Sequence, residues 1–355
     1  MKKAFFAFLA TALILILTGC PNPQVEETGT ITLTFGEGAR TAWPPTDANG
    51  LLSLLEHRVK LILKNSSTVT EAVISKGKNS ASISVTPGIY TVLVEAFLEG
   101  ILFASGDGFN PDGNVDIEVK AGQNAKVTVE MDEAVPNAKY FIVSNINEWD
   151  TAKNAAASGG STFILLTNNI TIAPPNPPTF GSTSGVNVTI AGKHTISLNA
   201  SSTGSLLDIE AGQTVTIQDV TLKGHSTNNA SLVFVSTGGT FIMNGQSSVT
   251  GNRGGPDGGG VAVSGNNSRF EMNGGTISGN TATQSGGGVS VSMLAKFYMT
   301  GGTIGGTGND RNTVSGSGGN GGGVYVGSIS TFEMSGDAKI IGNTVSASSG
   351  NGGGV

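Results

Sequence analysis

The sequence predicts an all-β protein in which an antiparallel β-sandwich precedes a parallel β-helix with a short N-terminal capping helix. Alternating apolar and polar residues in the first part and a glycine-rich repeat in the last part carry this prediction. Glycine makes up 54 of 355 residues, roughly twice its ordinary share. Charged residues make up 12% and the formal net charge is −6. This composition excludes a highly charged disordered chain and argues against nucleic acid as a partner.

Residues 1–19 are predicted to be a lipoprotein signal peptide. Two lysines precede an uncharged apolar run, residues 4–17, which is shorter than the about 20 residues that span a bilayer. The motif Leu-Thr-Gly-Cys at 17–20 resembles the lipobox of bacterial lipoproteins. The resemblance implies cleavage before Cys20, acylation of its thiol and attachment to a membrane, with residues 20–29 as a tether. The alternative is a plain cleaved signal with an incidental cysteine.

Residues 30–131 are predicted to form the β-sandwich. Val127, Val129 and Met131 alternate with polar residues, as in a strand with one buried face. Turn residues at 87–88 and 110–113 divide about seven such strands. Residues 87–96 resemble immunoglobulin-like or prealbumin-like spacer modules of bacterial surface proteins, which implies a spacing role. Residues 51–55 fit a helical turn or a strand, and 132–139 are expected to be a linker.

Residues 140–355 contain a repeat, which is typical of stacked coils. Each unit has a Phe-x-Met-x-Gly segment, then an aliphatic residue, then Gly-Asn, then a polar loop and Gly-Gly-Gly-Val. The equivalent phenylalanines are Phe241, Phe270, Phe297 and Phe332, and the equivalent valines are Val261, Val289, Val324 and Val355. The valines lie 28, 35 and 31 positions apart, and we assign this variation to the polar loop before the three glycines.

In a parallel β-helix, neighbouring coils lie about 4.8 Å apart. We therefore expect each phenylalanine to stack on the next and the inward residues to form ladders. The asparagines of the Gly-Asn pairs are expected to form an amide ladder at a turn. Its predicted members are Asn252, Asn280, Asn309 and Asn343.

A helix over residues 147–158 is expected to cover the first coil, with Asn147 as N-cap, one face formed by Trp149, Ala152 and Ala156, and a glycine stop at 159–160. At the other end, Val355 would begin a new coil and leave an unpaired edge. We therefore expect the chain to be the front part of a longer or truncated gene product.

The repeat, clearest over residues 270–291, resembles the right-handed β-helix repeats of bacterial polymorphic outer-membrane proteins and related surface lipoproteins. The resemblance covers about residues 205–355 and implies adhesion or surface display. Gly-Gly-Gly-Val stands where that family has Gly-Gly-Ala-aliphatic, and Ile277 stands where it has phenylalanine. The membrane barrel that ends the family's proteins has no counterpart in these residues.

Motifs for cofactors and metals are weak in this sequence. Residues 316–321 satisfy G-x-G-x-x-G, but a strand and not a helix is expected to follow. Residues 305–310 match part of the calcium-binding nonapeptide repeat, but Asn312 occupies its apolar position. His194 and His225 are expected at the surface, without a catalytic triad. We therefore predict no catalytic residue, no cofactor and no metal site.

A polysaccharide-active enzyme is the competing hypothesis, because the β-helix fold also hosts such enzymes. Glu271 and Glu333 occupy one repeat position two coils apart, with Tyr298 between them. Their expected separation of roughly 10 Å slightly exceeds the range for inverting glycosidases. Asp208 and Asp219 lie on earlier coils, and no cluster is expected to join them. Outward, solvated carboxylates are the favoured interpretation.

The sequence thus favours an exported structural or interaction protein that is lipid-anchored at Cys20 on the bacterial envelope, at the outer membrane or cell surface. Its Ser-, Thr- and Asn-rich surface is expected to contact an unknown host, matrix or neighbouring-cell ligand. The alternative is a polysaccharide lyase or glycoside hydrolase whose groove lies outside or is incomplete in this chain.

Overall fold

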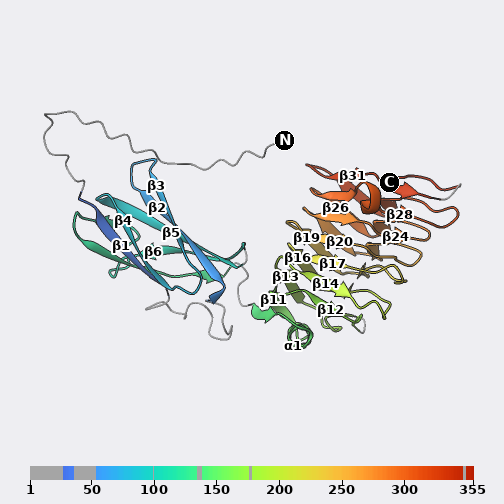
Figure 1. Cartoon of the computed structure of the whole chain (residues 1–355), viewed down its shortest axis with the longest axis horizontal. Coiled ribbons are helices and arrows are strands. Elements are labelled where there is room, and N and C mark those ends of the chain that lie inside the picture. Colours follow the sequence, from blue (N-terminus) through green and yellow to red (C-terminus); the bar gives the residue numbers. More distant parts are fainter. Residues whose placement is uncertain (1–26, 36–52, 99, 134–137, 176–177, 347–348) are drawn as a thin grey trace, which may run out of the picture.

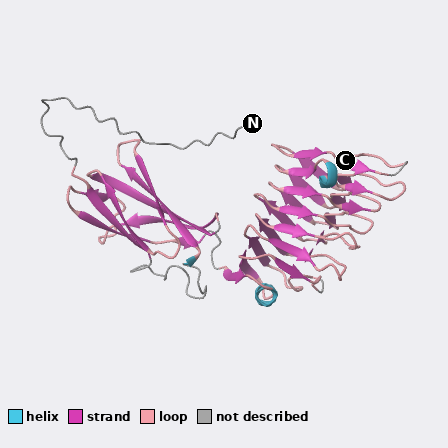
Figure 2. Ribbon diagram, viewed as in Figure 1, coloured by secondary structure: helices cyan, strands magenta, loops and turns pink. Residues whose placement is uncertain are grey.

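The computed structural model describes residues 27–35, 53–98, 100–133, 138–175, 178–346 and 349–355. These residues form two β-rich units, which Figure 1 and Figure 2 show, and one α-helix. Cys20 and the predicted signal peptide and tether up to residue 26 lie outside the described residues, as do Leu51 and Leu52.

The N-terminal unit is a nine-stranded mixed sheet that rolls around its own core. Its central path runs β3-β2-β5-β6-β8-β1-β4. The strands are β1 (Gly29–Phe35), β2 (Leu55–Leu63), β3 (Val69–Ile74), β4 (Ser80–Val85), β5 (Gly88–Leu98), β6 (Ile101–Phe109), β7 (Ile117–Val119), β8 (Asn124–Val129) and β9 (Asp132–Glu133).

The prediction of an antiparallel sandwich is confirmed only in part. β1 pairs antiparallel with β4 but parallel with β8, and β6 joins the two halves of the sheet into one path, so the unit is barrel-like. Alternation correctly predicts which side chains are buried, as in β1 with Ile31, Leu33 and Phe35 inside. It cannot predict the direction of pairing, because both ladder types place alternate residues on one face.

The C-terminal unit is a parallel β-helix, as predicted. Its eight-stranded sheet contains β10 (Lys139–Val143), β11 (Gly160–Leu166), β13 (Val186–Ala191), β16 (Gln213–Gln218), β19 (Thr240–Asn244), β22 (Arg269–Met272), β26 (Lys296–Met299) and β30 (Thr331–Met334). Its seven-stranded sheet contains β12 (Ile170–Ile172), β14 (Thr195–Leu198), β17 (Thr221–Lys223), β20 (Ser248–Thr250), β23 (Thr276–Ser278), β27 (Thr303–Gly305) and β31 (Lys339–Ile341).

Two smaller parallel sheets complete the coils. The five-stranded sheet contains β15 (Leu207–Ile209), β18 (Val233–Val235), β21 (Val261–Ser264), β25 (Val289–Ser292) and β29 (Val324–Val326), and the three-stranded sheet contains β24 (Thr281–Ala282), β28 (Thr313–Val314) and β32 (Thr344–Val345). One 3-10 helix, η2 (Gly308–Asp310), lies between β27 and β28.

The predicted phenylalanine stack is confirmed. Ring centroids of successive members lie 5.2, 4.6 and 4.9 Å apart, from Phe241 through Phe270 and Phe297 to Phe332, and their planes differ by at most 20°. Phe241, Phe270 and Phe297 are fully buried. Each coil alone is too thin to bury these rings, so stacking supplies the core.

The amide ladder is present, but one predicted member is wrong. Its members are Asn228, Asn252, Asn280, Asn312 and Asn343, each linked to the next by a hydrogen bond to its side-chain oxygen. Asn309 is exposed and lies in η2, whereas Asn312 is fully buried. Eight positions separate Ile304 from Asn312, whereas three separate Ile277 from Asn280. An insertion ahead of Asn312 therefore displaced the Gly-Asn motif, so coil length does not vary only in the polar loop before the three glycines.

The ladder also explains the last of the three glycines of the repeat. A Cβ at Gly288 would lie 2.9 Å from Nδ2 of Asn312 and 2.7 Å from the carbonyl oxygen of Gly323 in the next coil. Both contacts are too close for any side chain. Glycine here therefore lets the backbone approach the buried amide ladder.

The capping helix is α1 (Ile146–Ala156), and it packs on the first coil (Figure 1). The N-cap is Asn145, not Asn147 as predicted: its Oδ1 accepts from the backbone N–H groups of Asn147 and Glu148 at 3.0 and 3.1 Å. The shift of two residues arises because Asn145 and Asn147 both suit an N-cap. The buried face of Trp149, Ala152 and Ala156 is confirmed.

The two units share a contact that the sequence did not predict. Tyr140 and Phe163 point outward from β10 and β11, and their rings lie 4.8 and 6.0 Å from that of Phe103 in β6. Leu165 and Ala191 are buried in the same cluster. Both ends of the predicted linker lie in strands, since β9 pairs with β6 and β10 opens the β-helix. The sandwich thus packs on the outer side of the first coils.

Candidate binding surfaces

The outer side of the eight-stranded sheet brings together the predicted carboxylates. Glu271, Tyr298 and Glu333 occupy one outward row on β22, β26 and β30. Arg269 pairs with Glu271 at 2.5 Å, and its guanidinium carbon lies 4.4 Å from the centre of the Tyr298 ring. Arg269 therefore holds the Glu271 carboxylate and covers one side of the ring. This arrangement is a surface cluster in which Tyr298 stands between the two glutamates.

A second carboxylate pair was missed by the sequence analysis. Asp208 and Glu210 alternate along and just beyond β15, so they face the same side. Burial of Asp208, with the nearby Glu210 charge as a smaller cause, raises the pKa of Asp208 to about 6. The period of two along the strand could have revealed the pair, but the burial of Asp208, which lies beside Phe234 of the next coil, could not be foreseen.

The other residues considered for catalysis have structural roles. Asp219 accepts from the backbone N–H of Gln246 and from the side chain of Gln218. His225 contacts the carbonyl oxygen of Ser202 at 2.8 Å and the hydroxyl of Thr227 at 2.9 Å. His194 is half-buried. The structure does not bring these residues together with Asp208.

The seven-stranded sheet carries two outward columns of hydroxyl side chains, here called the hydroxyl face. One column contains Thr195, Thr221, Ser248, Thr276 and Thr303, and the other contains Thr171, Ser197, Thr250 and Ser278, with Lys223 between Ser197 and Thr250. Thr276 donates to Ser248 at 3.2 Å. Neighbouring hydroxyls in a column repeat about every 4.8 Å. The face therefore offers many weak donors and acceptors in a straight line.

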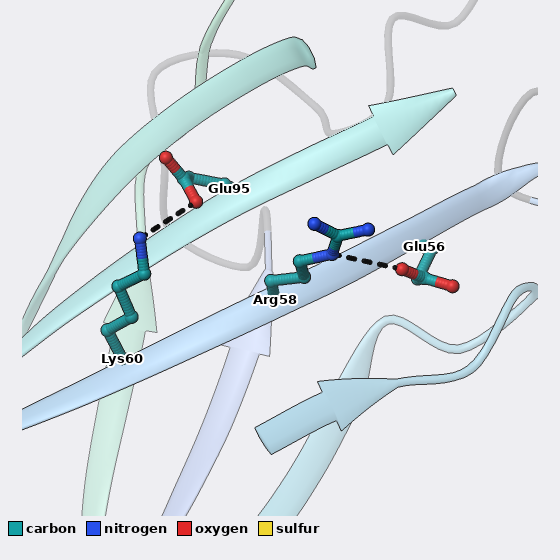
Figure 3. Close-up of polar contacts among 4 residues, drawn as sticks. All are labelled: Glu56, Arg58, Lys60 and Glu95. Atoms are coloured by element: carbon teal, nitrogen blue, oxygen red, sulfur yellow. Dashed lines mark hydrogen bonds and ion pairs between the residues drawn. The ribbon is translucent and has the colours of Figure 1, made fainter. Parts of the chain in front are cut away.

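The sandwich presents a charged outer face, two ion pairs of which are shown in Figure 3, and this face has a shallow hollow. Lys60 pairs with Glu95 at 3.3 Å, and Arg58 pairs with Glu56 at 3.2 Å while it lies 4.2 Å over the Phe97 ring. The hollow has a volume of about 330 Å³. Its lining is Lys60, Leu93, Val94, Glu95, Ser105, Gly106, Asp107 and Asp132. Half-exposed pairs of this kind contribute little to stability, and they leave the face polar.

The cofactor motifs do not form sites in the described parts of the chain. Residues 316–321 lead into strand β29 and not into a helix. The segment 305–310 contains η2, and no group of three His, Cys, Asp or Glu side chains suited to a metal ion occurs among the described residues. In the same residues, no helix is both long and apolar enough to cross a membrane.

Comparisons with protein-family models, with curated proteins and with solved structures find no match. Inferences about function therefore depend on the surfaces described above.

Proposed function

We propose that this protein is a structural or interaction protein of the bacterial cell surface, anchored by acylation of Cys20 and without catalytic activity of its own. In this proposal the β-helix is right-handed, like the polymorphic outer-membrane protein repeats that the sequence resembles. The sandwich, immunoglobulin-like or prealbumin-like in type, spaces the β-helix from the membrane. The exported chain acts as an adhesin-like rod.

The hydroxyl face is the observation that carries this proposal. It extends over several consecutive coils with uncharged Thr and Ser side chains, interrupted by Lys223 and followed by Lys339 after Thr303. An array of this kind suits contact with an extended, hydroxyl-rich polymer such as a glycan chain, because each coil adds an equivalent weak contact. The repeated interior keeps the array straight.

Binding is tested with immobilised glycans and matrix polymers and the full chain, using the variant Thr221→Val/Thr276→Val. Valine preserves the shape and removes two hydroxyls. The matched control is Thr214→Val/Thr216→Val on the outer side of the eight-stranded sheet. We expect binding to fall only for the first pair. Equal binding by both variants, or no binding by the wild type to any polymer, would contradict the proposal.

Anchoring is tested in cells by metabolic labelling with an alkynyl fatty acid and by protease treatment of intact bacteria. We expect label on the wild-type chain and none on Cys20→Ser, together with surface cleavage of the wild type. Unchanged labelling in Cys20→Ser would rule out acylation at this residue.

The alternative function is cleavage of a polysaccharide, and the Asp208–Glu210 pair is the observation that favours it. Asp208, whose pKa burial raises to about 6, and the neighbouring Glu210 supply the two carboxyl groups that glycoside hydrolysis needs. A screen for oligosaccharide release by the full chain tests this function. Release that is lost in both Asp208→Asn and Glu210→Gln would support it and overturn the non-catalytic proposal.

A further inference from the structure

In seven successive coils of the β-helix, one residue of the same loop has a left-handed backbone conformation, with positive φ. In the eight-stranded sheet, the residue two positions before the first outward residue of each strand from β11 to β30 has positive φ, between 60° and 86°. These residues are Gly159 (86°), Gly185 (76°), Gly212 (74°), Gly238 (76°), Asn267 (60°), Leu294 (69°) and Ile329 (60°). The turn therefore demands the same backbone conformation in every coil.

The early coils meet this demand with residues that suit it, and the late coils do not. Glycine has no Cβ, and asparagine tolerates the left-handed region better than most residues. Leucine and the β-branched isoleucine are unfavourable there. Met293, next to Leu294, also has positive φ, at 56°. Two successive turns thus carry three residues whose backbone conformation opposes folding.

Packing does not explain these three residues. Met293 is 69% exposed, Leu294 45% and Ile329 75%. Leu294 and Ile329 are equivalent in neighbouring coils, so the three side chains form one apolar ridge (Met293, Leu294 and Ile329). The backbone conformation is unfavourable and the side chains are largely exposed, and backbone strain of this kind gathers at sites of function.

The charges beside the apolar ridge are positive. Lys296 is exposed at the first outward position of β26, immediately after the turn with Met293 and Leu294, and Arg269 is exposed at the equivalent position one coil earlier. Lys296 has no ion pair among the described residues, whereas Arg269 pairs with Glu271. Glu271 and Glu333 lie one outward position farther along their strands. A partner that contacts the apolar ridge therefore meets an ammonium group before it meets a carboxylate.

We propose that the apolar ridge inserts into the surface of a lipid bilayer with anionic headgroups. A stable protein interface needs about 20–30 residues from each partner, far more than three side chains supply. Insertion into a bilayer needs no such area, since apolar side chains partition individually and nearby cations add attraction to anionic lipid. The apolar ridge is then a second membrane contact that does not depend on acylation of Cys20.

A site-specific probe tests this proposal in the full chain. Cys20→Ser removes the single cysteine, and Met293→Cys then carries an environment-sensitive nitrobenzoxadiazole label. We expect brighter, blue-shifted emission when vesicles of phosphatidylcholine and phosphatidylglycerol are added. Val73→Cys, on the sandwich and 63% exposed, is the control and should show no shift. If the predicted signal peptide alone bound the vesicles, it would not produce a blue shift at position 293 that is absent at position 73.

The variant Leu294→Asn/Ile329→Asn separates function from folding, because it copies Asn267 of an earlier coil. We expect its melting temperature to be no lower than that of the wild type, while the vesicle concentration for half the probe response rises at least about tenfold. A silent probe at position 293, or an unchanged response in the Asn variant, would overturn the proposal. A blue shift that grows with protein concentration without vesicles would overturn it in favour of a second copy of the chain.

Discussion

The sandwich and the β-helix bury comparable side chains by different means. In the sandwich, each strand has its own partners, in both parallel and antiparallel pairs, and residues such as Tyr90 and Phe103 occupy unique positions. In the β-helix, each inward residue lies on its equivalent in the next coil, as the phenylalanines and asparagines do. One unit therefore depends on long-range pairing and the other on repetition between neighbours.

The comparison teaches that repetition reveals contacts that a single alternating strand does not. Phe297 is matched to Phe270 by sequence alone, whereas nothing in the sequence pairs β1 with β8. The largest expected effect comes from removing one ring from the phenylalanine stack. We expect Phe297→Ala to destabilise the β-helix by about 3–5 kcal/mol, because the stacked rings on both sides lose contact. Urea unfolding measures the change.

Phe234→Ala is the matched control in the β-helix, since Phe234 points outward and is half-buried. We expect a loss less than half as large. Similar losses for the two variants would show that the stack is not the main source of stability in these coils.

The next largest effect concerns pH and the sandwich. His57 is fully buried and stacks on Phe35 with ring centroids 4.5 Å apart, and burial lowers the pKa of His57 to about 4. In the unfolded chain His57 binds a proton below about pH 6.5, whereas in the folded chain it does so only near pH 4. Sandwich stability should therefore fall as the pH falls from about 6.5 to 4, by up to about 3 kcal/mol.

Hydrogen exchange of β2 and β5 amides at several pH values measures this loss. His57→Phe keeps an aromatic ring and removes the titrating group, so its sandwich should show a flatter dependence over the same window. An equally steep dependence in His57→Phe would assign the effect to other groups.

The amide ladder gives a smaller effect with a close control. We expect Asn312→Ala to destabilise the β-helix by about 1–3 kcal/mol, because buried donors and acceptors lose their partner. Asn309→Ala, three positions earlier on the exposed η2, should change stability by less than about 0.5 kcal/mol. Thermal unfolding of both variants distinguishes them, and the reverse order would disprove the ladder assignment.

The smallest effect should run opposite to that of His57. Because the pKa of Asp208 is raised to about 6 in the folded chain, this carboxyl group binds a proton at a higher pH in the folded chain than in the unfolded chain. β-helix stability should fall slightly as the pH rises from about 4 to 6. Solvent screening keeps the change small, since Asp208 is only half-buried. Hydrogen exchange in β15 and β18 measures it, and Asp208→Asn should abolish it.

The sequence predicts most of the β-helix and less of its surroundings. The rows of Phe241, Phe270 and Phe297 follow from the repeat because equivalent residues must stack. Asn312 was missed since the Gly-Asn motif occurs by chance at 308–309, inside an insertion. The contact of Tyr140 and Phe163 with Phe103 was not predicted. Outward apolar residues indicate that something covers them, but the sequence does not say which segment does so.

The candidate surfaces follow the same division. The shared row of Glu271, Tyr298 and Glu333 was predicted, but the guanidinium of Arg269 over the ring was not, since side-chain conformation lies beyond any repeat pattern. The hydroxyl face was expected only as a polar composition. Its two columns became visible once the register of the coils was known.

The segment that includes η2 shows how this architecture can acquire new sequence. Five extra residues between Ile304 and Asn312 leave Ile304 in register with Ile277 and Asn312 in register with Asn280. A peptide grafted at this bulge would thus protrude from one coil while those above and below keep their alignment. Diversification, by evolution or by an engineer, can proceed there one coil at a time.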